Sequence, residues 1–194
     1  MNQFLIKVRD QSFLWLSLLL TIVMATITSG CSEEKARERK EAAPIGACDV
    51  LEKKPDDIKK PLEVNYGDKA KLLGLTAEKL SQNQLRVVYF WQPLDEIEPY
   101  HQVFVHFSDM EGNNLFGNDH PFCEQKPFVE LKGKFVKESF MINIPGSAVG
   151  KIVYIKIGVY APELKSGQRL QITSRGAAPT DDANTRAIVE KINL

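Results

Sequence analysis

The sequence is poor in the residues from which catalytic and metal sites are usually assembled. Its 194 residues include three histidines and three cysteines, and they contain no HExxH motif, no Walker-type phosphate loop, no GxSxG elbow and no CxxC pair. These absences exclude the enzyme classes that such motifs identify. We therefore expect a protein that is not an enzyme and that uses no cofactor and no metal ion.

The sequence also lacks an excess of charge of either sign. The chain carries 25 basic and 25 acidic residues, so its formal net charge at pH 7 is zero. Proteins that hold nucleic acid by neutralising its phosphates need a basic face. We expect no nucleic-acid partner, and the overall balance gives no sign of a polyanionic ligand.

One long hydrophobic run is present at residues 12–28, and it follows the basic residues Lys7 and Arg9. Two small residues and then Cys31 come directly after it. This order of basic, apolar and small residues is typical of an export signal. The end of the run resembles the lipobox of bacterial lipoproteins, which implies that residues 1–30 are a signal peptide and that Cys31 receives a lipid anchor.

The same run is about as long as a short membrane span, so a retained membrane anchor is the alternative. A stop-transfer helix is usually followed by positive charge, whereas Ser32, Glu33 and Glu34 come first here. Both interpretations place the rest of the chain in the cell envelope. The lipoprotein resemblance further implies fatty acids such as palmitate at Cys31. Because Ser32 rather than aspartate follows that cysteine, it also implies an outer-membrane protein facing the periplasm.

Two cysteines remain once Cys31 carries lipid. Exported proteins fold in compartments that are often oxidising, where two thiols can pair. We predict a disulfide between Cys48 and Cys123. Two buried free thiols are the alternative, because spacing in the sequence does not establish proximity.

Residues 31–61 are rich in charged and poor in large apolar side chains, so we predict a lipidated N-terminus followed by a charged tether. Short runs of alternating apolar residues begin at Leu62 and indicate one domain at residues 62–194. We predict an all-β fold, a single antiparallel β-sandwich of jelly-roll or immunoglobulin-like type with about eight or nine strands. The expected strands are 62–66, 69–77, 84–92, 101–109, 114–120, 136–144, 151–160, 168–174 and 186–193.

Every second residue from Val153 to Val159 is apolar, and this row is predicted to face the core. The residues between them face the opposite side. The best candidates there for an exposed ligand-binding face are Tyr154, Lys156 and Tyr160. Aromatic rings on such a face suit stacking on sugar rings. A second sheet or a loop that simply covers these residues is the alternative.

The histidine-containing segment 101–120 is predicted to be a hairpin that turns near Gly112. With a two-residue turn, His106 and Asp119 share one face and lie opposite or diagonal to each other. Together with Phe104 they are predicted to bind a ligand such as a sugar hydroxyl. A solvated polar pair is the alternative, because two ligand-type side chains do not make a metal site.

Five segments of the predicted domain form a set of core-type motifs: Tyr66–Asp68, Leu72–Gly74, Leu85–Gln92, Val103–Phe107 and Ile157–Tyr160. This set resembles the β-sandwich module appended to bacterial membrane glycosyltransferases of the dolichyl-phosphate-mannose-mannosyltransferase type. The resemblance covers residues 62–194 and implies the sandwich fold. It carries over no transferase activity, and it implies a sugar-related role only through the proteins in which such modules occur.

The leading hypothesis is a lipid-anchored β-sandwich protein of the cell envelope with a non-catalytic binding or structural role. Its expected partners are the membrane, through the lipid, and a glycan or an envelope protein. The alternative is an envelope hydrolase whose site surrounds His106 and Asp119.

Replacing Cys31 with alanine tests the lipid anchor. We expect the Cys31→Ala protein to keep its precursor mass and to carry no fatty acid, because the lipobox cysteine both accepts the lipid and begins the mature chain. Mass spectrometry of the purified protein measures both effects. Processing and lipid content that match those of wild type would contradict the prediction.

Overall fold

Two antiparallel sheets pack face to face, and the all-β sandwich predicted from the sequence is confirmed. The computed structural model describes residues 46–95, 101–126, 128–161 and 168–194. The first sheet has the spatial order β1 (Ala47–Leu51), β8 (Phe135–Asn143), β4 (Gln84–Pro93), β3 (Ala70–Ser81), β2 (Pro61–Tyr66) and β11 (Ile172–Ser174). The second has the order β10 (Gln168–Arg169), β9 (Ile152–Ala161), β5 (Gln102–Ser108) and β6 (Asn114–Gly117).

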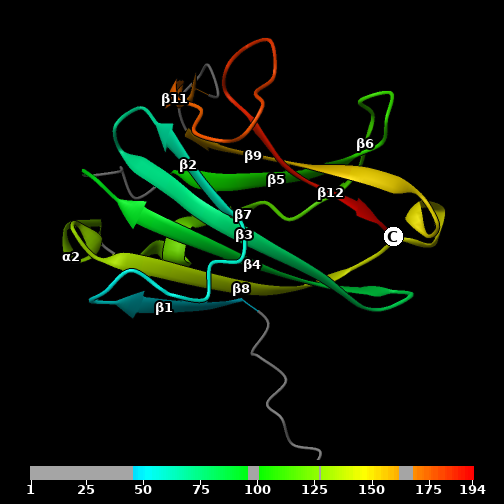
Figure 1. The fold of residues 1–194 in the computed structure, drawn as a ribbon, viewed down its shortest axis with the longest axis horizontal. Coiled ribbons are helices and arrows are strands. Elements are labelled where there is room, and N and C mark those ends of the chain that lie inside the picture. Colours follow the sequence, from blue (N-terminus) through cyan, green and yellow to red (C-terminus); the bar gives the residue numbers. More distant parts are fainter. Residues whose placement is uncertain (1–45, 96–100, 127, 162–167) are drawn as a thin grey trace, which may run out of the picture. The chain divides into compact units, whose positions relative to one another are not determined.

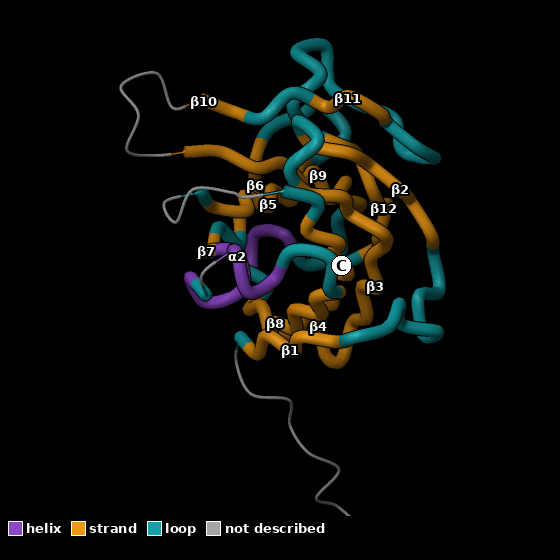
Figure 2. Tube along the Cα trace, turned by 90° about the vertical axis from the view of Figure 1, so that its left-hand side faces the viewer, coloured by secondary structure: helices purple, strands orange, loops and turns teal. Residues whose placement is uncertain are grey.

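Two further strands complete the second sheet, since β12 (Ala187–Asn193) pairs with β9 and β7 (His120–Pro121) pairs with β5. Single helical turns lie between strands at η1 (Phe122–Gln125), α2 (Phe128–Leu131) and η2 (Gly146–Ala148). Figure 1 shows β5 and β9 above β4 and β8. In Figure 2, which is turned by 90° from the view of Figure 1, β10 and β11 both lie at the top of the domain.

The alternating rows predicted from the sequence form the core. Leu85, Val87, Tyr89 and Trp91 of β4 are fully buried, and so is the row from Val153 to Val159 of β9. Inward side chains of both sheets belong to one hydrophobic cluster. A hydrogen bond also joins the sheets, because the hydroxyl of Tyr66 on β2 donates to the carbonyl of Ile157 on β9 over 2.9 Å.

The folded domain begins before Leu62, so the predicted boundary at residues 61 and 62 is wrong. Strand β1 pairs with β8 from Ala47 to Leu51, and Cys48 and Val50 pack against the core. These two inward side chains are too few to produce a visible alternation within a charged segment. The prediction of a tether can therefore apply only to residues before β1.

The segment between β1 and β2, also assigned to the tether, covers part of the outer face of the first sheet. Ile58 packs on a small cluster that contains Leu73 and Phe90. At Gly74 a Cβ atom would collide with Ile58 and lie 2.6 Å from the carbonyl oxygen of Lys60. Only glycine therefore allows this close approach.

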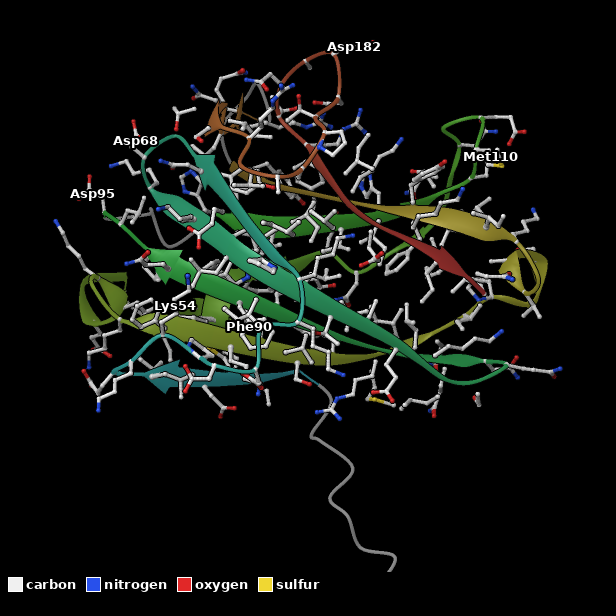
Figure 3. The ribbon with its side chains drawn as sticks, viewed as in Figure 1. Lys54, Asp68, Phe90, Asp95, Met110 and Asp182 are labelled. Carbon is white, nitrogen blue, oxygen red and sulfur yellow. A yellow bond between two sulfur atoms is a disulfide. The ribbon has the colours of Figure 1, made fainter. Side chains whose placement is uncertain are left out.

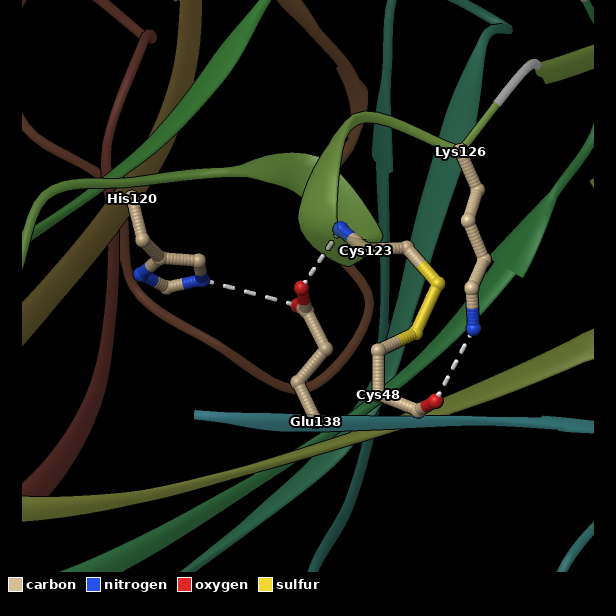
Figure 4. The surroundings of a disulfide bond; sticks show 5 residues. All are labelled: Cys48, His120, Cys123, Lys126 and Glu138. Atoms are coloured by element: carbon tan, nitrogen blue, oxygen red, sulfur yellow. Dashed lines mark hydrogen bonds and ion pairs between the residues drawn. A yellow bond between two sulfur atoms is a disulfide. The ribbon is translucent and has the colours of Figure 1, made fainter. Parts of the chain in front are cut away.

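The predicted disulfide joins Cys48 of β1 to Cys123 of η1, with 5.2 Å between the two Cα atoms. Beside it, the buried carboxylate of Glu138 accepts the backbone N–H of Cys123 over 2.7 Å (Figure 4). Lys126 donates to the carbonyl of Cys48 over 3.3 Å. The edge strand β1 is thus attached to the rest of the domain by a covalent bond and by polar contacts around it.

No helix among the described residues is long and apolar enough to cross a membrane. Residues 1–45, which include the predicted signal peptide and Cys31, lie outside the described part of the chain. The lipid anchor and the envelope location remain predictions.

Removing the disulfide should destabilise the domain strongly. The bond closes a loop with a sequence separation of 75 residues, for which the loop-entropy treatment gives about 4 to 5 kcal/mol. We expect the Cys48→Ser/Cys123→Ser protein to unfold at correspondingly lower urea, followed by the fluorescence of the buried Trp91. Wild-type protein in a thiol reductant is the control for the loss of the bond alone, and a double variant as stable as oxidised wild type would contradict the prediction.

Candidate functional site

An open groove of about 970 Å³ lies beside the outward face of strands β5 and β9. Its walls come from segments that are far apart in the sequence, namely β5, the link between β6 and β7, β9, β10 with the link that follows it, and the loop before β12. The lining residues are Phe104, His106, Asp119, Tyr160, Gln168, Arg169, Gln171, Ala183 and Thr185.

The pairing of β5 with β9 places the groove residues. Phe104 lies opposite Gly158, and His106 lies opposite Lys156. Their neighbours Val103 and Val105 are fully buried in the core. Because successive side chains of a strand point to opposite faces, Phe104 and His106 lie on the outward side.

An aromatic cluster forms the floor of the groove. The rings of Tyr160 and Phe104 meet edge to face, with 5.6 Å between their centroids. The centroid of the His106 ring lies 5.3 Å from that of Phe104. The guanidinium of Arg169 lies 5.1 Å from the Phe104 centroid. At Gly158 a Cβ atom would collide with the Phe104 ring and lie 2.6 Å from the carbonyl oxygen of Thr185, so the missing side chain makes room for this floor.

His106 and Asp119 lie side by side, although the hairpin lacks the two-residue turn from which this was predicted. Strand β5 ends at Ser108 and β6 begins at Asn114, and the register between them shifts by one residue. Strand β6 pairs Gly117 with His106, and the Nε2 atom of His106 is 3.9 Å from a carboxylate oxygen of Asp119. The same oxygen accepts the backbone N–H of Val105 over 3.1 Å. Asp119 therefore binds the backbone of β5 and also lines the groove.

The imidazole of His106 favours its neutral form. Partial burial lowers its pKa below the ordinary value of 6.5, the Asp119 carboxylate raises it, and the positive charges of Arg186, Arg169 and Lys156 lower it. The net shift is downward. At neutral pH the ring can therefore both donate and accept one hydrogen bond.

The loop between β11 and β12, with Asp182 at its tip in Figure 3, supplies a wall of the groove. The side chain of Asp181 accepts the backbone N–H groups of Thr185 and Arg186 over 2.8 and 3.0 Å and also the Nε–H of Arg186 over 2.6 Å. Asn184 donates to the carbonyl of Ile172 over 2.7 Å. These bonds hold the loop on both sides of Thr185.

Thr185 carries an unused polar group at this wall. It is 5% exposed, and its hydroxyl oxygen has no hydrogen-bond partner. A buried hydroxyl without a partner is costly, by about 1 to 3 kcal/mol. The oxygen itself is closed to solvent, so Thr185 contributes other atoms to the lining of the groove.

Four of the six predicted ligand-binding residues line the groove: Phe104, His106, Asp119 and Tyr160. The other two, Tyr154 and Lys156, do not line it, although they share the outward face of β9. Lys191 lies over the Tyr154 ring at 5.7 Å, so Tyr154 has a neighbour of its own.

Sequence reasoning missed Arg169 and Thr185. Arg169 belongs to the two-residue strand β10, and Thr185 follows a polar stretch that reads as an ordinary loop. No local pattern marks either residue, because the folded positions of β10 and the loop bring them to β5.

The groove offers recognition groups more clearly than a catalytic set. Among the described residues, no three His, Cys, Asp or Glu side chains gather as metal ligands would. His106 and Asp119 provide an imidazole and a carboxylate, but at 3.9 Å they are not hydrogen-bonded as the base and carboxylate of a hydrolytic triad are.

Comparisons with protein-family models, curated proteins and solved structures give no match for this chain. The function is therefore argued from the groove and from the sequence pattern of the N-terminus.

Adding a methyl group at Gly158 should disturb both the fold and the groove. The new Cβ would meet the Phe104 ring and the Thr185 backbone, and we expect the Gly158→Ala protein to lose about 1 to 3 kcal/mol in urea unfolding. Gly146→Ala is the matched control, since its Cβ would have no neighbour within 4 Å. Equal stability of the two variants would show that the ring does not lie against Gly158.

Proposed function

We propose that this protein is a lipid-anchored protein of the cell envelope that binds a carbohydrate in its groove without transforming it. The observation that carries the proposal is the floor of adjoining Phe104 and Tyr160 rings, with His106, Asp119 and Arg169 beside it. A sugar presents apolar C–H groups and hydroxyls together. Ring faces suit the former, and clustered donors and acceptors suit the latter.

The chemical balance of the site supports a polar ligand. Phe104 is 3% exposed, whereas Tyr160 and His106 are partly exposed and remain accessible to a ligand. The neutral imidazole of His106 can donate one hydrogen bond and accept another. The open form of the groove suits part of an extended glycan better than a small enclosed molecule.

Two observations support the envelope location. The Cys48–Cys123 disulfide is typical of proteins that fold in an oxidising compartment. The N-terminal run that ends at Cys31 has the pattern of a lipoprotein signal. The proposed location is the outer membrane, facing the periplasm, with the lipid as membrane partner and a glycan as ligand.

Calorimetric titration of the full-length protein with neutral and acidic trisaccharides tests the proposed binding. We expect at least one of cellotriose, chitotriose, maltotriose and trigalacturonate to bind, and Tyr160→Ala to weaken that binding about tenfold through loss of stacking and contact area. Tyr154→Ala is the matched control, because Tyr154 lies on the same strand outside the groove.

The same samples distinguish a binding protein from a hydrolase. Intact saccharide recovered after long incubation supports binding alone. Shortened products that disappear in His106→Ala would instead support the hydrolase built on His106 and Asp119. No binding of any saccharide in the panel would contradict the proposal.

A further inference from the structure

Arg169 brings a positive charge to the groove although the whole chain is neutral. It is the basic residue of the lining, which also holds the Asp119 carboxylate, and Lys156 lies nearby, opposite His106 on the neighbouring strand. Neither Arg169 nor Lys156 forms an ion pair with another described residue within 4.0 Å. The neutral balance of the whole chain does not show where such single charges lie.

The nearby acidic groups already have other partners. Asp181 binds the Arg186 side chain and two backbone N–H groups. Burial raises its pKa, but the hydrogen bonds from Arg186 and Thr185 outweigh burial, so the pKa lies below its ordinary value. Asp119, the acidic residue on the groove, contacts His106 and the Val105 backbone. Neither carboxylate forms an ion pair with Arg169 within 4.0 Å.

The guanidinium of Arg169 is placed for recognition of an anion. It lies over the face of the Phe104 ring, which holds a planar cation without using its N–H groups. A guanidinium in this position can direct two parallel N–H donors at one carboxylate or phosphate. The adjoining ring of Tyr160 is partly exposed at the same groove.

We propose that the saccharide bound in the groove is acidic, and that Arg169 binds its carboxylate or phosphate group in a bidentate manner beside the aromatic floor. This inference rests on the proposed carbohydrate binding. It names Arg169 as the residue that separates acidic from neutral sugars. His106 and Asp119 then meet the hydroxyls of the sugar rather than its charge.

A matched pair of ligands isolates the charge. Trigalacturonate and its trimethyl ester have the same ring skeleton, and only the former carries carboxylates. We expect the full-length protein to bind the acid at least about tenfold more tightly than the ester, as a charge-assisted hydrogen-bonded pair predicts. Arg169→Gln should bind the two forms equally, at the level at which wild type binds the ester.

Arg175→Gln is the control variant, because it removes the same charge from an exposed loop residue that does not line the groove. It should keep the preference for the acid. Glucose 6-phosphate and glucose form the corresponding pair for a phosphate group. Whichever pair shows the larger ratio of affinities, charged over neutral ligand, tells whether the groove prefers a phosphate or a carboxylate.

The outcomes separate this inference from the proposed function. Equal binding of acid and ester, or binding of neutral trisaccharides alone, overturns the acidic specificity and leaves carbohydrate binding standing. A preference that survives in Arg169→Gln overturns the role of that residue. Failure of every saccharide, acidic or neutral, overturns both proposals.

Discussion

The antiparallel pairing of β5 with β9 is the constraint on which both the core and the groove depend. It sends Val105 and Ile157 into the space between the sheets and leaves Phe104 on the outward side, opposite Gly158. A shift of one residue would reverse every side chain of the strand. The burial of the inward row therefore fixes the outward row as well, and the groove follows from the energetics of the core.

A second constraint acts at the other sheet, where the edge strand β1 meets η1. His120 lies 2.8 Å from the carbonyl oxygen of Asn118, and since a carbonyl only accepts, its Nδ1 donates. Its Nε2 faces the buried Glu138 carboxylate at 3.5 Å. The other carboxylate oxygen accepts the N–H of Cys123, in a turn where Cys123 has a positive φ of 43°. The disulfide and this buried polar group together hold a backbone conformation that non-glycine residues rarely adopt.

Most strands could be predicted, because one of their faces is buried against the other sheet. The expected strand 168–174 is wrong, since it is two short strands, β10 and β11, that belong to different sheets. The alternation at Val153–Val159 is a direct consequence of that burial, and the outward positions of Phe104, His106 and Tyr160 follow from it by parity. Strand β1 could not be predicted in this way, because its pairing with β8 and the bond at Cys48 hold it more than its own apolar residues do. Short strands that depend on distant partners carry little local signal.

Only part of the groove could be predicted from the sequence in the same way. Its floor belongs to β5 and β9 and is readable from their period of two, whereas the wall with Thr185 belongs to a loop held by Asp181 and Asn184. Arg169 joins the two parts, because it comes from short β10 and lies over Phe104 of the floor. A ligand group that reaches the guanidinium must also lie beside the aromatic rings. In the proposed site, charge recognition and ring contact are therefore coupled, because the guanidinium of Arg169 lies on the ring of Phe104.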